Sequence, residues 1–311
     1  MTTEILDQPH RKVLITGSQG MLGRAFAQQL ALHLPQVEVL ALSKSDWDVR
    51  DSGRVGELAH WVGAGWILHC AALVDVERCA REPDLAREII VGGTANVAHI
   101  AAAAGAKIVY PQSFLIYDGT ESPITEQTIP NPQALYAALK LAAEALILGQ
   151  STGNLSIRMA GFFGGEEKDK NFVGKIVPHI HGLILAGTRS FAVGDRVWQP
   201  TYTQDLARNA LLMASRGCSG VYTMASHGQA SFWDLTMAIV DELGWRGRIE
   251  ITKTASENVA KSELGRRPAR AVIFNQRLQT EELDWQRPWQ ESLHDYLASE
   301  YFKPFRIEPN P

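Results

Sequence analysis

The stretch KVLITGSQGMLG, residues 12–23, decides the fold class of this chain. Its first five residues, 12–16, are mostly apolar and β-branched, which predicts a short buried strand. Glycine follows at Gly17, Gly20 and Gly23, and apolar residues then recur every fourth position, as they do along an amphipathic helix. A strand that passes through a glycine-rich turn into a helix is typical of the first unit of an open α/β sheet.

The three glycines match the needs of a pyrophosphate-binding turn. There the strand turns tightly, the backbone approaches the phosphates and the helix packs on the sheet, and each step favours a residue without a side chain. The N–H groups and partial positive charge of the helix N-terminus also favour an anion. We therefore expect five residues to bind a dinucleotide cofactor: Gly17, Ser18, Gly20, Met21 and Leu22. The alternative is a glycine-rich turn without a ligand.

Four further apolar segments predict strands. They lie at 37–42, 66–69, 107–110 and 155–158, with helical patterns between them. Alternation of strands and helices over short connections predicts a parallel sheet covered by helices on both faces. Since the crossovers of such sheets are right-handed, we expect an α/β fold with a doubly wound parallel sheet, a Rossmann fold.

The alternation of strands and helices weakens after about residue 165. We expect residues 11–165 to form a dinucleotide-binding domain. Residues 166–311 are expected to form a smaller α+β portion that mainly binds the substrate. Some segments of this second portion are expected to pass back into the first sheet.

Composition restricts the function further. Thirty Lys and Arg against 34 Asp and Glu give the 311 residues a net charge of −4, which argues against an electrostatic nucleic-acid binder. Three cysteines are too few for a disulfide framework, and His179 with His181 lacks a third ligand, so we expect no metal site. Neither a signal-peptide core nor an apolar run of about 20 residues is present, which favours a cytoplasmic protein without a membrane partner.

The end of the second predicted strand carries the signal for the cofactor. An acidic residue there binds the ribose hydroxyls of NAD, whereas a basic residue accommodates the 2′-phosphate of NADP. Here the strand runs into Ser43 and Lys44, with Asp46 slightly later, and a hydroxyl with an ammonium suits a phosphate. We therefore favour NADP, with NAD as the alternative. Asp48 can accept a hydrogen bond from the adenine amino group or serve as a turn residue.

Tyr136 and Lys140 lie four residues apart on a predicted helix and so share one face. A neighbouring ammonium lowers the pKa of a tyrosine from about 10, so that the phenol can exchange a proton with an alcohol or carbonyl oxygen. Ser113 follows the fourth predicted strand, at the edge where open α/β sheets bind ligands, and its hydroxyl can hydrogen-bond the same oxygen. The alternatives are an exposed helix pair and an ordinary loop serine.

Six stretches of the chain resemble the extended short-chain dehydrogenase/reductase superfamily and, within it, the dTDP-4-dehydrorhamnose reductase family. The stretches follow the order of the family over nearly the whole chain. They are TGSQGMLG (16–23), HCAALVDVERCAREPDLA (69–86), YDGTESPITEQTIPNPQALYAALKLAAEALI (117–147), KNFV (170–173), QPTYTQDLA (199–207) and RRPARAVIFNQRL (266–278).

The resemblance implies NADPH-dependent reduction of a 4-keto group on a nucleotide-linked deoxysugar. It implies that Tyr136 is the acid, that Lys140 binds the nicotinamide ribose and tunes Tyr136, and that Ser113 matches the Ser or Thr of the family. Other positions match a segment on the adenine and phosphate side, Cys70, Ala71 and Ala72, and a segment near the nucleotide-sugar site, Asn171 and Phe172.

The chain departs from the family pattern around the predicted reaction centre. The Asp and Tyr that commonly follow the hydroxyl residue are replaced by Phe114 and Leu115, which removes polar contacts to the substrate and leaves the sugar open. Pro111 lies in a strand expected to be central, and since proline donates nothing to a ladder, we expect the strand to end or bend there. Ile90 occupies a helix position that usually carries Asn.

Two further residues are candidates for substrate binding, together with Phe114. Trp198 can stack on a sugar or base, or serve as a packing residue. Arg267 can reach a substrate phosphate bidentately, or lie in solvent. The predicted partner is a nucleotide-sugar substrate, and a homodimer is also considered.

Two other functions fit the same fold. The chain also resembles the regulatory β subunit of methionine adenosyltransferase, which uses a reductase-like body as a binding partner. The apolar Phe114 and Leu115 are compatible with such a non-catalytic nucleotide-binding role. The other alternative is a nucleotide-sugar epimerase or dehydratase, which would retain a tightly bound cofactor without net loss of NADPH.

Overall fold

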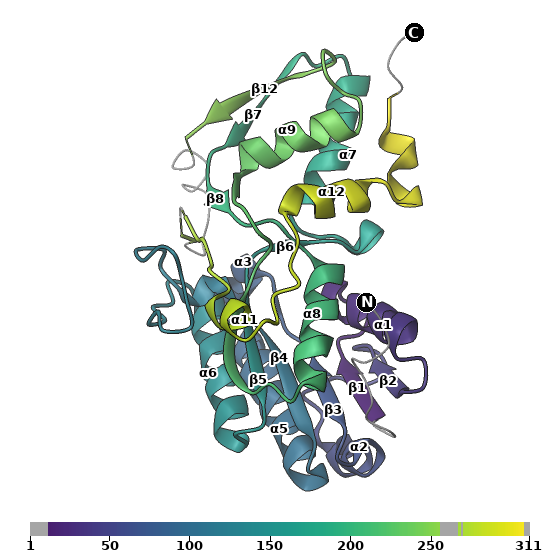
Figure 1. Ribbon diagram of the computed structural model, residues 1–311, viewed down its shortest axis with the longest axis vertical. Coiled ribbons are helices and arrows are strands. Elements are labelled where there is room, and N and C mark those ends of the chain that lie inside the picture. The colour runs from purple at the N-terminus through teal and green to yellow at the C-terminus, as the bar shows by residue number, and fades with distance from the viewer. Residues whose placement is uncertain (1–11, 256–266, 269, 308–311) are drawn as a thin grey trace.

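The computed structural model describes residues 12–255, 267–268 and 270–307. Its centre is a six-stranded parallel sheet in the order β10-β5-β4-β3-β1-β2 (Figure 1). The strands are β1 Lys12–Thr16, β2 Glu38–Leu42, β3 Trp66–His69, β4 Lys107–Ser113, β5 Leu155–Met159 and β10 Gly220–Met224. Strand β1 pairs with β2 on one side and with β3 on the other, so the chain winds outward in both directions. The predicted doubly wound Rossmann sheet is confirmed.

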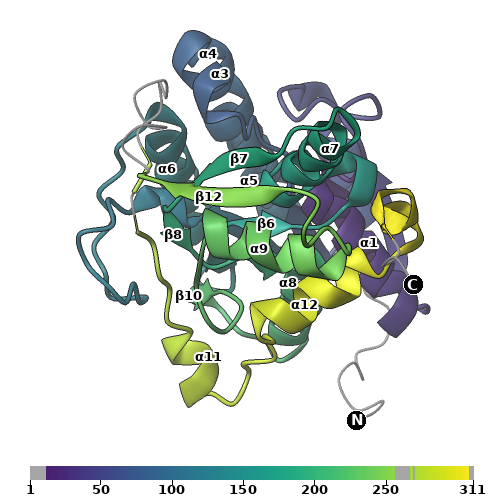
Figure 2. The same ribbon diagram turned by 90° about the horizontal axis from the view of Figure 1, so that it is seen from above.

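The C-terminal half builds a second group of elements at one end of the sheet, as Figures 1 and 2 show. They pack around a core of their own and are α7 Phe172–Leu185, β7 Ser190–Gly194, α9 Phe232–Glu242, β12 Glu250–Thr254 and α12 Trp289–Leu297. Two segments of this half belong to the central sheet layer instead. Strand β10 pairs with β5, and α8 Thr203–Ser215 packs on α1 Met21–His33. A domain boundary at residue 165 stays a prediction.

The remaining elements are short. The helices are α3 Val76–Arg81, α4 Pro83–Arg87 and α11 Gln276–Thr280. Two pairs of short strands are β6 Phe162–Phe163 with β9 Thr201–Tyr202, and β8 Val197–Trp198 with β11 Ala230–Ser231. Short 3₁₀ helices lie at Ser52–Arg54, Phe114–Ile116, Glu166–Lys168 and Glu300–Phe305.

Helices cover both faces of the central sheet, because alternate residues of each strand point to opposite faces. One face is covered by α2 Val55–Val62, α5 Gly93–Ala104 and α6 Leu135–Gln150. The other face is covered by α1 and α8, whose apolar side chains meet Val13 and Ile15 of β1. Leu14, between these two residues, belongs to the first face. This alternation accounts for the nearly continuous apolar sequence of the strand.

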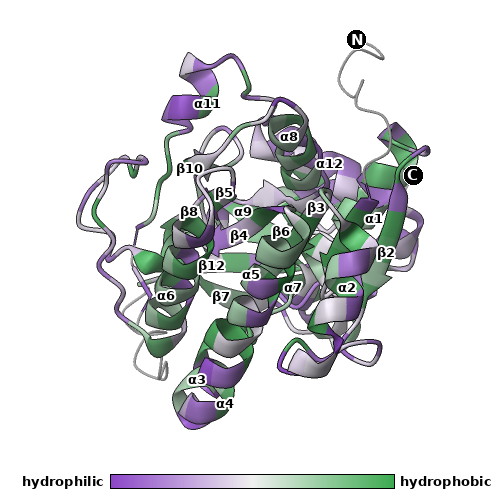
Figure 3. Ribbon diagram, turned by 90° about the horizontal axis from the view of Figure 1, so that it is seen from below, coloured by the Kyte–Doolittle hydropathy of each residue, from purple (hydrophilic) through white to green (hydrophobic). Residues whose placement is uncertain are grey.

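Helix α6 is mostly apolar, as its mainly green colour in Figure 3 shows. Its two charged residues, Lys140 and Glu144, are both buried. The helix therefore turns its charged side chains inward, toward the sheet. Among the described residues, no helix is both long and apolar enough to cross a membrane.

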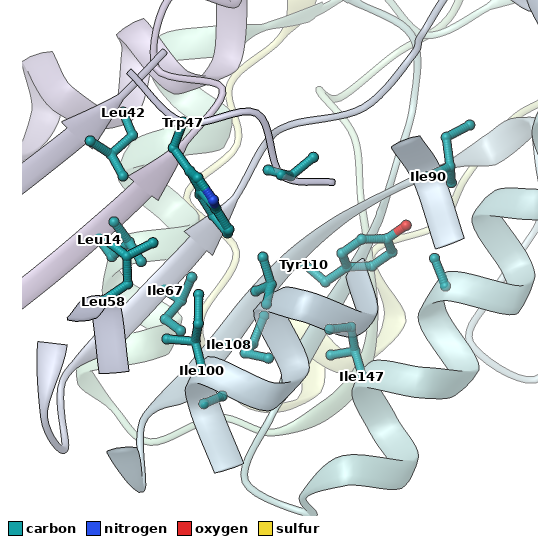
Figure 4. Packing of buried hydrophobic residues seen from close by; sticks show 14 of the residues in the cluster. Leu14, Leu42, Trp47, Leu58, Ile67, Ile90, Ile100, Ile108, Tyr110 and Ile147 are labelled. Atoms are coloured by element: carbon teal, nitrogen blue, oxygen red, sulfur yellow. The ribbon is translucent and has the colours of Figure 1, made fainter. Parts of the chain in front are cut away.

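The core beneath α2 and α5 fixes the position of three neighbouring strands. Leu14 of β1, Ile67 of β3 and Ile108 of β4 lie in one cluster with Leu58 of α2 and Ile100 of α5 (Figure 4). All five side chains are fully buried. Burial of each such side chain contributes about 1.5–3 kcal/mol of transfer free energy. The strand ends that carry the candidate site are therefore held on a rigid layer.

A glycine brings α5 close to the segment that follows β2. Helix α4 passes through a π-helical turn at Glu88–Gly92 into α5. A Cβ on Gly93 would lie 2.5 Å from Cγ2 of Val49, so a larger residue would push the two segments apart. The amide of Asn96 also donates to the Val49 carbonyl at 2.8 Å. The loop after β2 is thereby anchored on α5.

Strand β4 does not end at Pro111, contrary to the expectation from the sequence. The strand continues to Ser113, and Pro111 pairs with Ile157 of β5 in the parallel register. Pairing with β3 stops at Val109, two residues before the proline. Pro111 therefore lies where β4 has a strand neighbour on one side only, which is the situation of an edge strand.

Candidate active site

The glycine turn between β1 and α1 has the backbone that the sequence predicts. Gly17 adopts a φ of +65°, which favours glycine, and a Cβ there would lie 2.8 Å from the backbone nitrogen of Ala71. A Cβ on Gly23 would collide with the carbonyl oxygen of Gly17, so this glycine lets α1 pack on the turn. Gly20 caps α1, and its N–H donates to the Gly17 carbonyl at 3.0 Å. Gly17 and Gly20 carry no side chains, which lets the backbone of the turn approach a phosphate.

The N-terminus of α1 can accept an anion. Gly20 provides no side-chain cap, and the first turn of the helix contains no acidic residue. The first N–H groups of a helix have no acceptor within it, and those of Met21 and Leu22 belong to this set. The N–H of Ser18 donates to the Leu42 carbonyl at 3.0 Å, which joins the turn to the end of β2. These residues fit the pyrophosphate of a dinucleotide.

Beyond β2 the chain presents an exposed cation. The hydroxyl and N–H of the buried Ser43 donate to the Asp46 carboxylate at 2.6 and 2.8 Å, which holds the pKa of Asp46 below its usual range. Arg50 donates to both oxygens of Asp48 at 3.0 and 2.7 Å and lowers the pKa of Asp48 to about 2. Asp48 is thus engaged by Arg50, a partner that sequence reasoning missed. Lys44 is exposed beside Asp48.

The segment after β3 lies against the glycine turn. The N–H groups of Cys70 and Ala71 donate to the carbonyl and the hydroxyl of Thr16, each at 3.2 Å, and Ala72 follows. Burial raises the pKa of the Cys70 thiol to about 12, and the charge of Lys140 on α6 acts in the opposite direction. Cys70 therefore lies within electrostatic reach of α6, so this segment connects the glycine turn with the helix.

Tyr136, Lys140 and Ser113 meet at the carboxyl end of β4. Tyr136 and Lys140 lie one turn apart on α6 and are only 7% and 5% exposed, so they are no exposed pair. The Lys140 ammonium donates to the Pro111 carbonyl at 2.7 Å, and the Ser113 side chain lies near enough to Tyr136 to act on the pKa of its phenol. The Leu115 N–H donates to the Ser113 hydroxyl at 3.2 Å, which orients it. The structure brings these three predicted residues together.

Burial sets the protonation of the two α6 residues. It raises the pKa of Tyr136 above its ordinary value, while the nearby Ser113 side chain acts in the opposite direction. The pKa of Tyr136 therefore rises, whereas the spacing from Lys140 predicts that it falls. Burial also lowers the pKa of Lys140 to about 7. At neutral pH, Tyr136 therefore carries its proton and can donate it.

Next to Lys140 lies a buried polar cluster that the sequence analysis did not identify. It consists of His69, Thr16 and Thr94. Nδ1 of His69 lies 2.8 Å from the Thr16 hydroxyl, and Nε2 lies 3.0 Å from the Thr94 hydroxyl. Burial, and secondarily the charge of Lys140, lower the pKa of His69 to about 3, so the ring is neutral. The Lys140 ammonium lies 3.9 Å from the ring centroid of Tyr110. The signal for this cluster is a histidine at the end of an otherwise apolar strand.

Next to Ser113 lies a cluster of four aromatic rings, which we call the aromatic wall. Its members are Phe114, Trp198, Phe232 and Phe172. A Cβ on Gly161 would lie 2.6 Å from the ring of Trp198 and 3.5 Å from the ring of Phe114, so both rings touch this glycine. The ring centroid of Trp198 lies 5.3 Å from that of Phe232, which lies 4.4 Å from that of Phe172. Three predicted substrate residues, Phe114, Trp198 and Phe172, thus belong to one wall. Trp198 is largely buried in it.

Asn171 and Arg267 are held by polar contacts. Asn171 precedes α7, and its side-chain amide donates to the Phe162 carbonyl at 2.7 Å. Arg267 lies 3.3 Å from the carboxylate of Glu77 on α3, and both side chains are about one quarter exposed. Arg267 is therefore paired rather than solvated alone. A substrate phosphate would have to compete with Glu77 for its guanidinium.

The two histidines at 179 and 181 take part in packing. The ring of His179 lies 5.0 Å from that of Phe191, and the ring of His181 lies 6.1 Å from that of Trp245. Across the residues that the structure describes, no three His, Cys, Asp or Glu side chains are grouped so that they could hold a metal ion.

The ends of β1 to β4 and the facing side of α6 thus bring together a glycine turn that fits a pyrophosphate and a Ser-Tyr-Lys cluster at one edge of the sheet. This combination defines a dinucleotide-binding α/β protein of the extended short-chain dehydrogenase/reductase class. A family model described as RmlD substrate binding domain matches residues 11–302, and the chain belongs to this family. The resemblance stated from the sequence is confirmed.

Three relatives illustrate the similarity. Methionine adenosyltransferase 2 subunit beta of Rattus norvegicus is 30% identical over 261 residues, which are 78% of this chain and 75% of that protein. The dTDP-4-dehydrorhamnose reductase of Mycolicibacterium smegmatis is 27% identical over 298 residues, 94% of this chain and 87% of that protein. The crystal structure of a dTDP-4-dehydrorhamnose reductase from Clostridium acetobutylicum has a TM-score of 0.83 at 30% identity and covers 92% of this chain and 98% of its own.

Proposed function

We propose that this chain is an NADP(H)-dependent oxidoreductase that reduces a keto group on a nucleotide-linked deoxysugar. The observation that carries the proposal is the cluster of Ser113, Tyr136 and Lys140, which lies at the same sheet edge as a turn that fits a dinucleotide pyrophosphate. Two relatives that cover nearly the whole chain are named dTDP-4-dehydrorhamnose reductases, and they support the substrate class.

Each residue of the cluster has a role in this reaction. Bound NADPH supplies a hydride to the carbonyl carbon of the substrate. Tyr136 donates its proton to the carbonyl oxygen, and the Ser113 hydroxyl hydrogen-bonds the same oxygen. The positive charge of Lys140 stabilises the phenolate that Tyr136 leaves behind. Its ammonium has three N–H donors, of which one reaches the Pro111 carbonyl, so two remain for the ribose of the cofactor.

The direction of the reaction fits the protonation of the site. Because burial raises the pKa of Tyr136, the phenol holds its proton at neutral pH, as an acid in a reduction must. Lys140, with a pKa of about 7, is partly charged under the same conditions. The exposed Lys44 supports NADP over NAD, because the nearby Asp46 and Asp48 are engaged by Ser43 and Arg50.

Oxidation of NADPH with a panel of dTDP-linked and other nucleotide-linked 4-keto sugars tests the proposal. We expect turnover of at least one sugar. In Tyr136→Phe we expect kcat to fall by about 10²-fold or more with the affinity for NADPH retained, because only the proton donor is removed.

Other outcomes of the same assay favour other functions. Tight binding of NADPH with no turnover of any sugar would favour a non-catalytic regulatory role, and one relative is named as a subunit of methionine adenosyltransferase 2. Product formed without net loss of NADPH would favour an epimerase or a dehydratase.

We also propose a cytoplasmic location and a homodimer, with a small nucleotide sugar and no nucleic acid as partner. The net charge of −4 supports the absence of nucleic acid. The outward side of α6 supports the homodimer, because its exposed residues are uncharged and mostly small. Fractionation of cells would test the location.

A further inference from the structure

A third ionisable group lies on the same face of α6 as Tyr136 and Lys140. Glu144 follows Lys140 by one turn and is 2% exposed. Its carboxylate accepts hydrogen bonds from the guanidinium of Arg158 at 2.9 and 3.1 Å and from the hydroxyl of Ser156 at 2.6 Å. The line of buried groups that starts at the reaction centre therefore ends in an ion pair with β5.

The burial of this ion pair calls for an explanation. Arg158 is 8% exposed, and its other terminal nitrogen donates to the hydroxyl of Tyr117 at 2.9 Å, so the network is well hydrogen-bonded. Even so, buried ion pairs lose so much hydration that an apolar pair of the same volume often stabilises a fold equally well. Stability alone therefore gives a weak reason for Glu144 and Arg158, and the reaction described above uses neither residue.

The surroundings of Lys140 give Glu144 a role. The groups around the ammonium are Tyr110 and the Pro111 carbonyl from β4, His69 and Cys70 from the end of β3, and Tyr136 and Glu144 on α6 itself. Burial lowers the pKa of His69 to about 3, and it raises the pKa of Cys70 to about 12 and those of Tyr110 and Tyr136 above their ordinary values. All four are neutral at pH 7. Among these described groups, Glu144 supplies the negative charge.

Burial and Glu144 act on Lys140 in opposite directions. Burial lowers the pKa of Lys140 to about 7, while Cys70 and, after it, the carboxylate of Glu144 raise it. Because the Cys70 thiol keeps its proton at pH 7, the carboxylate of Glu144 is the anion that acts there. Because the resulting value lies at neutrality, a small change in this balance decides whether an ammonium or a neutral amine lies one turn from Tyr136.

We propose that Glu144, held by Arg158 and Ser156, is a positioning residue that keeps Lys140 charged. A charged Lys140 stabilises the phenolate of Tyr136, whereas a neutral amine does not. This catalytic consequence rests on the proposed function. The charge of Lys140 does not depend on the proposed function, and it can be measured without a substrate.

The test follows Lys140 by NMR in protein labelled with ¹³C at the lysine Cε, with Lys140→Met to assign the signal. In Glu144→Gln the titration midpoint of Lys140 is expected to fall by about 1 pH unit from the wild-type value, because the stabilising anion is lost. If the chain is a reductase, the alkaline limb of kcat/KM moves to lower pH as well, since the ammonium then loses its proton earlier.

Two further variants make the outcome decisive. Glu144→Gln leaves the charge of Arg158 without its partner. The double variant Glu144→Gln, Arg158→Met removes both charges, and we expect it to lower the titration midpoint of Lys140 by less than Glu144→Gln alone does. The matched control is Asp205→Asn, because Asp205 pairs with Arg287 at 3.1 Å on α8, on the other face of the sheet. This variant is expected to lose stability without a change at Lys140.

An unchanged Lys140 midpoint in both Glu144 variants would overturn the proposal, as would an equal shift in the control. A lowered midpoint in a chain that reduces no sugar would support the role of Glu144 and count against the proposed function alone. The two proposals can therefore fail independently of each other.

Discussion

We propose that Lys44 is the side chain that favours NADPH over NADH. Its neighbours Asp46 and Asp48 are engaged by Ser43 and Arg50, so Lys44 is the exposed group that remains for a phosphate. In Lys44→Glu we expect the Kd for NADPH to rise about 10- to 100-fold, because a carboxylate would face the 2′-phosphate. NADH lacks this phosphate and is the matched control ligand. Fluorescence titration measures both, and an equal change for NADPH and NADH would show that Lys44 does not contact the phosphate.

The ring of Trp198 packs against Gly161 and occupies the space that a side chain at residue 161 would need. Since a Cβ there would lie 2.6 Å from the indole, Gly161→Ala must displace the ring. We expect the KM for the sugar to rise about tenfold, which corresponds to about 1.4 kcal/mol of lost contact, with the affinity for NADPH unchanged. Stability is expected to fall by about 1–3 kcal/mol from overpacking.

A second glycine serves as the control for this substitution. A Cβ on Gly182 of α7 meets nothing within 4 Å, so Gly182→Ala is expected to leave KM unchanged and to stabilise the helix by about 0.5–1 kcal/mol. Steady-state kinetics and thermal unfolding measure both variants. A normal KM in Gly161→Ala would place Trp198 outside the substrate site.

At the scale of elements, one buried histidine ties three of them together. His69 of β3 contacts Thr16 of β1 and Thr94 of α5, and it is neutral because burial lowers its pKa from 6.5 to about 3. Between these two values the unfolded chain binds a proton that the folded chain does not, so stability is lost as the pH falls through this window. From pH 7 to pH 5 the loss amounts to about 2 kcal/mol.

The variant His69→Gln removes this pH dependence. Glutamine still hydrogen-bonds but does not titrate, so the variant is expected to be less stable than wild type at pH 7 and to lose about 2 kcal/mol less between pH 7 and pH 5. Urea unfolding at the two pH values gives both numbers. If wild type and variant lose the same stability, the ring of His69 is not the group responsible.

Local patterns predict much of what these elements do. The glycine turn and the spacing of Tyr136 and Lys140 are short-range features, so the sequence suffices to place them on one strand end and one helix face. Pro111 shows the limit of this reasoning. Its missing N–H argues against a strand, yet pairing with β5 carries β4 on to Ser113, because tertiary pairing outweighs a local preference. Burial likewise reverses the direction in which the pKa of Tyr136 was expected to move.

At the scale of the whole molecule, the contacts between the two halves are what the sequence does not reveal. Trp198 rests on Gly161, and Arg267 pairs with Glu77 of α3, so each contact joins segments that are distant in the chain. Hydrophobic periodicity reports which face of an element is buried, but not which partner covers it. The sequence therefore predicts Trp198 and Arg267 as candidates for substrate binding, but it does not predict their partners Gly161 and Glu77.

Helix α6 joins the site to the outer surface of the molecule. Its charged residues are buried, whereas Ala138, Ala142, Ala145 and Leu146 are exposed on its outward side. In a two-fold symmetric dimer the same patch of both copies meets itself. An uncharged patch of small residues can do so without like-charge repulsion, so we propose α6 as the centre of the proposed homodimer.

Leu146 tests this arrangement, because its side chain is 39% exposed near the end of the helix. Leu146→Glu would bring two carboxylates close to a two-fold axis, and we expect the dimer dissociation constant to rise at least about tenfold, since like charges across an interface cost affinity. Leu32→Glu is the matched control, because Leu32 is 69% exposed on α1, on the other face of the sheet. Sedimentation velocity over a range of concentrations separates the cases. A wild-type chain that stays monomeric at high concentration would contradict the dimer, whereas equal weakening by both substitutions would move the interface away from α6.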